Sequence, residues 1–160
     1  MEPCHSGCMS RALTADELNA AFRPRDRREV ELPTELRFPL ALDPFVTWHV
    51  GPRAFLVLPS QGEGERPPMG LVFHRDASGP AMPAMCEWCH ATRGRGEVTL
   101  LSCEVTHRRY VGLYLCRDLG CGKRSDDYPR PENFYERRTA DERMAAILTR
   151  MRTFAKRHLF

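Results

Sequence analysis

Hydrophobic residues recur at helical spacing near both ends of the chain. Residues 14–17 (TADE) form a capping box, which predicts a short helix over about 15–22. Residues 139–142 repeat the same box, and the apolar positions after it predict an amphipathic helix over 140–158 that packs on a sheet. The charged stretch over 24–33 fits either a brief second helix or a loop.

The middle of the chain has the pattern of β-strands. Residues 46–50 alternate between apolar and polar, and apolar runs over 53–58 and 69–73 are separated by a loop rich in Gly and Pro. Residues 97–105 and 109–116 form a predicted hairpin with its turn at 106–108. We therefore expect an α+β fold, an antiparallel sheet with flanking N- and C-terminal helices.

Four cysteines carry the clearest chemistry in the chain. Cys86 and Cys89 form a CxxC pair, and Cys116 and Cys121 follow after a spacer of 26 residues. Zinc takes four ligands in a tetrahedron, and an all-cysteine set leaves no open position for a water molecule. The cysteines predict a structural Zn²⁺ site in a binding module.

The order of parts around these cysteines is that of a treble-clef zinc finger. A CxxC knuckle comes first, a hairpin second, and a second ligand pair opening into a helix third, within about residues 84–124. The second pair is spaced by four residues, and one turn that contains Gly120 can bring both sulfurs to one metal.

The remaining cysteines and nearby histidines have weaker patterns. Cys103 lies inside a predicted strand and is expected to be a small buried hydrophobe. Cys4 and Cys8 lie in a tail, residues 1–12, that we expect to be flexible, with no second ligand pair nearby. His90 is the better reserve ligand if a cysteine were replaced, and His107 is the other.

Length and composition fit one globular domain, expected over residues 13–160. The sequence shows no membrane span and no secretory signal, so a cytoplasmic location is expected, where thiols stay reduced. The formal charge is −3 over residues 1–90 and +6 over 91–160. The basic half fits an acidic protein or RNA, or it offsets the charge of a four-thiolate zinc site.

Sequence motifs of the common enzymes are missing from the chain. It has no phosphate-binding glycine loop, no GxSxG and no HExxH, and no carboxylate pair can be assigned to acid–base chemistry. We therefore expect a protein that is not an enzyme.

Two stretches resemble the treble-clef zinc-finger domain of the elongation factor G-binding family, which includes the FusB-type fusidic-acid-resistance proteins: MCEWCHATRGRGEVTLLSC and RRYVGLYLCRDLGC. The resemblance implies Cys86, Cys89, Cys116 and Cys121 as zinc ligands. It also implies non-catalytic binding to elongation factor G, which promotes release of the factor from ribosomes. The resistance proteins carry an N-terminal helical bundle, so this chain resembles a short form with the zinc domain alone.

Aromatic and basic residues beside the cysteines are the expected contacts with the partner: Trp88, Tyr114, Arg117 and Lys123. For Trp88 and Tyr114, packing against the zinc core is an equally good interpretation. For Arg117 and Lys123, the alternative is that their side chains are simply solvated. An RNA- or ribosome-binding zinc finger is the alternative function.

Overall fold

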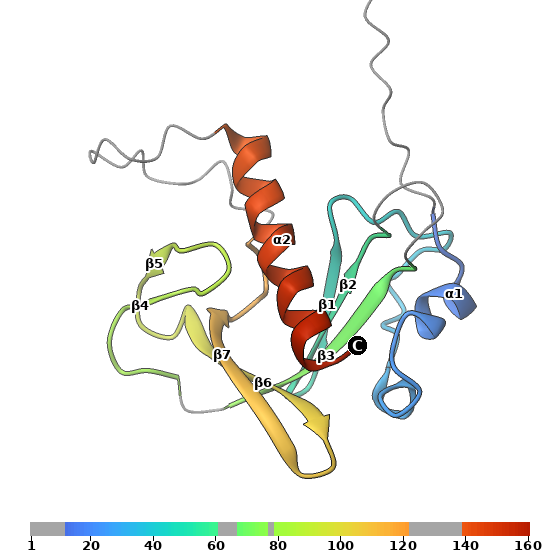
Figure 1. The fold of residues 1–160 in the computed structure, drawn as a ribbon, viewed down its shortest axis with the longest axis horizontal. Coiled ribbons are helices and arrows are strands. Elements are labelled where there is room, and N and C mark those ends of the chain that lie inside the picture. Colours follow the sequence, from blue (N-terminus) through green and yellow to red (C-terminus); the bar gives the residue numbers. More distant parts are fainter. Residues whose placement is uncertain (1–11, 61–66, 77–78, 122–138) are drawn as a thin grey trace, which may run out of the picture.

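A five-stranded sheet forms the centre of the protein (Figure 1). The structure is a computed structural model and describes residues 12–60, 67–76, 79–121 and 139–160. Its elements are α1 (Ala15–Ala20), a 3-10 turn (Arg27–Glu29), β1 (Val46–Val50), β2 (Arg53–Leu58), β3 (Met69–Arg75), β4 (Ala84–Met85), β5 (Thr92–Arg93), β6 (Val98–Thr106), β7 (Arg109–Cys116) and α2 (Ala140–His158). The expected α+β fold is confirmed.

The large sheet is antiparallel throughout, in the order β1-β2-β3-β6-β7. The predicted hairpin is present as β6 and β7, with Thr106 opposite Arg109. β4 and β5 form a separate two-stranded ribbon. None of the described helices is long and apolar enough to cross a membrane.

Both capping boxes form as the sequence predicts. The Thr14 and Thr139 hydroxyls accept the backbone N–H three residues on, and the glutamate there accepts the N–H of the threonine. α2 has its predicted bounds, whereas α1 ends at Ala20. α1 is shorter than expected because the chain pairs with β3 directly after the helix. The Gly70 N–H of β3 donates to the Ala21 carbonyl (2.9 Å), and Phe22 forms an isolated parallel β-bridge with Gly70.

β2 is buried on both faces, which explains its continuous apolar run. Because side chains alternate between faces, Leu56 and Leu58 point into the core that contains the cysteines, while Phe55 and Val57 point into a second core under α1. The protein is thus a layered structure with one apolar cluster on each face of the central strands.

α2 lies across the sheet on the side of the cysteine cluster (Figure 1). The buried residues of the helix share one core with the cysteines: Ile147, Met151, Phe154 and Ala155. Any loosening of the cysteine cluster therefore reaches the helix directly. The predicted flexible tail, with Cys4 and Cys8, lies almost wholly outside the described residues, as does Lys123.

Candidate metal centre

The β4–β5 ribbon holds the first cysteine pair in a tight turn. The Cys86 N–H donates to the Ala91 carbonyl (3.0 Å), and the His90 N–H donates to the Cys86 carbonyl (2.8 Å). His90 has a φ of 60°, in the left-handed region, where it reverses the chain after the second sulfur. The knuckle predicted from the CxxC spacing is therefore present.

The second pair lies at the end of β7 and in the turn after it. Cys116 is the last residue of the strand, and the Leu119 N–H donates to its carbonyl (2.8 Å). The Asp118 carboxylate accepts the Gly120 N–H (2.9 Å), which tightens the turn so that Cys121 comes back toward Cys116. The predicted turn with Gly120 is confirmed, whereas the segment directly after Cys121, where the sequence places the start of a helix, lies outside the described residues.

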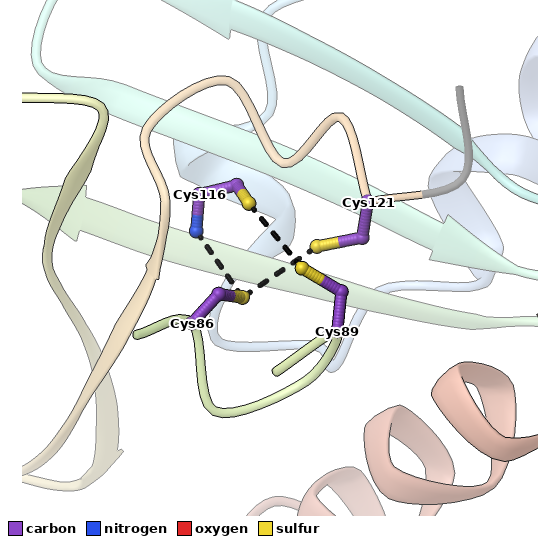
Figure 2. A group of neighbouring side chains, drawn as sticks. All are labelled: Cys86, Cys89, Cys116 and Cys121. Carbon is purple, nitrogen blue, oxygen red and sulfur yellow. Dashed lines mark hydrogen bonds between the residues drawn. The ribbon is translucent and has the colours of Figure 1, made fainter. Parts of the chain in front are cut away.

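All four sulfurs lie within 4.8 Å of one another and are buried. Figure 2 shows them pointing from two separate segments toward a common centre. The Cys86–Cys121 and Cys89–Cys116 sulfur pairs are each 3.7 Å apart. A tetrahedron with Zn–S bonds of about 2.3 Å has edges of about 3.8 Å, so the cluster has the dimensions of a zinc site.

Hydrogen bonds within the cluster already favour the thiolate form of the knuckle cysteines. Hydrogen bonds from Cys116 and then Cys121 lower the pKa of Cys86 to about 7, and the same two partners lower the pKa of Cys89 strongly. The Cys116 N–H also donates to the Cys86 sulfur (3.4 Å). The hydrogen bond with Cys121 lowers the pKa of Cys116, but the hydrogen bonds with Cys86 and Cys89 and burial outweigh it and raise the pKa, and the hydrogen bonds with the other three cysteines raise that of Cys121. Because metal ligands must be deprotonated, a cation that binds here displaces the protons of the second pair.

Arg93 of β5 supplies a compensating charge beside the sulfurs. Burial lowers its pKa, but a hydrogen bond to Cys116 and the charges of Cys116 and Cys89 outweigh burial and raise the pKa. Zinc with four thiolates carries a formal charge of −2, so a guanidinium at this position offsets part of it. The sequence analysis gave this role to the basic half of the chain as one alternative, and the structure brings Arg93 of that half to the site.

A comparison with protein families decides what this centre is. The family model described as the FBP C-terminal treble-clef zinc-finger matches residues 18–157. The chain belongs to this family. A comparison of the chain with curated proteins finds no match.

The FBP zinc-finger binds Zn²⁺ through Cys86, Cys89, Cys116 and Cys121, because the family match and the cysteine geometry agree. The family model and the cysteine cluster bear out the treble clef that the sequence predicted. With four protein ligands the site is closed, so the metal holds the knuckle to the end of β7. Zinc at this position is a structural element of the core.

Trp88 lies in the core of the FBP zinc-finger. Its side chain is 2% exposed, with Phe73 and Phe154 in edge-to-face contact at 5.7 and 6.2 Å between ring centroids. Arg150 of α2 donates to the Trp88 carbonyl (2.6 Å). Of the two interpretations of Trp88, an exposed anchor at the knuckle tip or packing against the zinc core, the structure has the second.

Tyr114 is 45% exposed, and Arg117 is also exposed. Glu87 of the knuckle holds the Tyr114 backbone twice: its carboxylate accepts the Tyr114 N–H (2.8 Å), and its own N–H donates to the Tyr114 carbonyl (2.9 Å). The role of Glu87 was not foreseen, because sequence spacing does not show which edge of β7 faces the knuckle.

Tyr110 is a second exposed aromatic, at 56%, that the sequence analysis did not single out. It lies on β7 four residues before Tyr114, so both side chains stand on the same face of the strand with Gly112 between them. Because side chains alternate between the two faces of a strand, the spacing of Tyr110 and Tyr114 in the predicted strand 109–116 could have indicated this pair from the sequence.

Cys103 is buried in β6 outside the cysteine cluster, as expected. Burial raises its pKa well above that of a free thiol, so it stays protonated and unreactive. His90 and His107 are exposed and take no part in the cluster of metal-ligating side chains in the described chain.

Proposed function

We propose that this zinc-finger is a cytoplasmic, non-catalytic module that binds translation elongation factor G and promotes its release from the ribosome. The observation that carries the proposal is the family match over residues 18–157, joined to the resemblance of the cysteine segments to factor-binding proteins. A closed four-thiolate site is suited to shaping a surface, because it has no position at which a substrate could meet the metal.

The exposed face of β7 is the surface we assign to the partner. Tyr110 and Tyr114 project from one rigid strand, and Glu87 fixes the Tyr114 backbone to the zinc knuckle. Aromatic side chains on a rigid frame lose little conformational entropy on binding and often dominate interfaces. Arg117 follows directly after β7, and Lys123 is the remaining predicted contact.

Calorimetric titration of the zinc-loaded protein into elongation factor G, at low and physiological salt, tests the proposal. We expect one-to-one binding that changes little with salt, and a loss of affinity of about tenfold or more for Tyr114→Ala. Phe160→Ala is the matched control, because Phe160 is an aromatic of similar exposure at the far end of α2. Absence of binding at both salt concentrations would refute the proposal.

RNA is the alternative partner, favoured by the charge of +6 over residues 91–160. Binding through phosphates releases counterions, so the logarithm of the RNA affinity should fall linearly with the logarithm of salt concentration. Affinity for ribosomal RNA with this salt dependence, together with no affinity for the factor, would replace the protein partner.

A further inference from the structure

An open cleft of about 280 Å³ lies beside the zinc turn, at one end of the sheet. It is lined by His49, Arg75, Gly96, Glu97, Arg117 and Asp118, and we call it the His49 cleft. Its walls come from β1, β3, the turn before β6 and the turn between the last two zinc ligands. The zinc site thus shapes one wall of the cleft.

Two guanidinium groups of the cleft have no carboxylate partner among the described residues. Arg75 donates through Nη2 to the Gly51 carbonyl (2.9 Å), which anchors the side chain at the β1–β2 turn. The Arg117 side chain makes no hydrogen bond or ion pair within the described chain, while its N–H holds the turn to the Glu97 carbonyl (2.8 Å). Both cations therefore keep donors for a ligand.

The two carboxylates of the cleft are already used in their own turns. Glu97 accepts the Gly94 N–H (2.8 Å), and Asp118 accepts the Gly120 N–H (2.9 Å). They shape the backbone around the cleft, and their charges set the limit on how strongly an anion is held.

His49 adds a third polar group. Its Nε2 is buried and has no hydrogen-bond partner in the described part of the protein, which is unusual because buried polar atoms are nearly always paired. Burial, and then the nearby charge of Arg75, lower the pKa of His49 and outweigh the Arg117 backbone and the charge of Asp118, which raise it. No hydrogen bond between His49 and the Arg117 backbone has normal geometry, so the imidazole is neutral at pH 7 and its Nε2 stays unpaired among the described residues. A ligand in the cleft would supply the missing partner.

We propose that the His49 cleft binds a phosphate group, held by Arg75, Arg117 and His49. Guanidinium groups recognise oxyanions through paired N–H donors, and a tetrahedral phosphate offers oxygens to three groups that converge from different segments. A volume of about 280 Å³ lies just below the usual range for small-molecule sites, so a phosphate with a small ester substituent fits. The inference does not rest on elongation factor G binding, although Arg117 is shared with the surface assigned to the factor.

Titration of ¹⁵N-labelled, zinc-loaded protein with sodium phosphate, at ionic strength held constant with sodium chloride, tests the proposal by NMR. We expect saturable shifts of the His49 ring nitrogens and of the Arg75 and Arg117 amides. Arg117→Ala should weaken binding by about tenfold or more, because it removes a charged donor without breaking a contact within the described fold.

The matched control is Arg157→Ala, which removes an exposed arginine of α2 far along the sequence from the cleft and should leave the affinity unchanged. Glu97→Gln keeps the acceptor for the Gly94 N–H while removing a negative charge, so it should tighten phosphate binding. His49→Gln gives a second loss-of-binding variant if Arg117→Ala disturbs the zinc turn, which metal analysis would reveal.

A short oligouridylate, compared with inorganic phosphate at equal phosphate concentration, identifies the source of the phosphate. Shifts of His49 with both ligands assign the cleft to an RNA backbone phosphate, and shifts with inorganic phosphate alone assign it to a free phosphate or a small ester. Shifts that do not saturate, or that are equal in Arg117→Ala and the parent protein, overturn the proposal.

Discussion

Substituting Cys116 by serine removes one of the four sulfurs that converge at the metal. Cys116 is fully buried at the end of β7, and its sulfur lies 3.7 Å from that of Cys89. A serine hydroxyl is a poor ligand for zinc beside three thiolates, since the metal prefers thiolate or imidazole donors in structural sites. The substitution therefore acts on the metal first and on packing second.

The size of the effect follows from where the metal lies. Structural zinc contributes about 10–16 kcal/mol in zinc-finger peptides at pH 7. The whole free energy of unfolding of a domain is about 5–15 kcal/mol. Because the cysteines share one core with Trp88 and with Met151 and Phe154 of α2, loss of zinc should release the knuckle and the helix together. We expect Cys116→Ser to lose cooperative unfolding.

Cys103→Ser is the matched control, because it makes the same chemical change at a buried cysteine of the neighbouring strand. Burying an unpaired hydroxyl there costs about 1–3 kcal/mol, or about 2–12 °C in Tm. Zinc content is measured by mass spectrometry after dialysis against a chelator, and unfolding is followed by circular dichroism. The parent protein and Cys103→Ser should retain one zinc ion, and Cys116→Ser none.

Retention of zinc by Cys116→Ser, with a Tm close to that of Cys103→Ser, would refute the reasoning. That result would mean that three sulfurs and a water or hydroxyl suffice, and that the metal contributes little to the core. Equal loss of zinc in both variants would mean that general destabilisation, rather than ligation, releases the metal.

Three further substitutions test other parts of the argument. Gly70→Ala would place a Cβ 2.6 Å from two ring carbons of the buried Phe22, so we expect the free energy of unfolding in urea to fall by about 1–3 kcal/mol. When Gly70→Ala is combined with Phe22→Leu, the loss should be smaller than the sum of the losses of the two single variants. Thr139→Ala removes the cap of α2 and should cost about 1 kcal/mol in the same assay, and no change would show that the cap is redundant. Arg93→Met should speed transfer of zinc to a chelator by about tenfold. The same substitution at Arg95, an exposed arginine in the turn after β5, should not, and equal rates would remove Arg93 from the metal centre.

Local chemistry determined most of the elements and the metal site. Each capping box satisfies free N–H groups within four residues, so both helix starts could be read from the sequence. Both cysteine pairs could be predicted from the sequence for the same reason. A CxxC turn and a turn with Gly120 each bring two sulfurs together locally. The hairpin between them is also a local structure, closed at residues 106–109.

Contacts between distant segments needed the tertiary structure. The early end of α1 depends on a hydrogen bond from the Gly70 N–H to the Ala21 carbonyl. The burial of Trp88 depends on its ring contacts with Phe73 and Phe154. Neither contact has a sequence spacing that could predict it, because pairing across the sheet and packing of α2 join residues far apart in the chain. The capping boxes and cysteine spacing were thus determined by the sequence by itself. Which aromatic is buried, which stays on the surface, and which polar groups meet at the His49 cleft were decided by the tertiary structure, through the order of the strands, the packing of α2 on the sheet and the turn after β7.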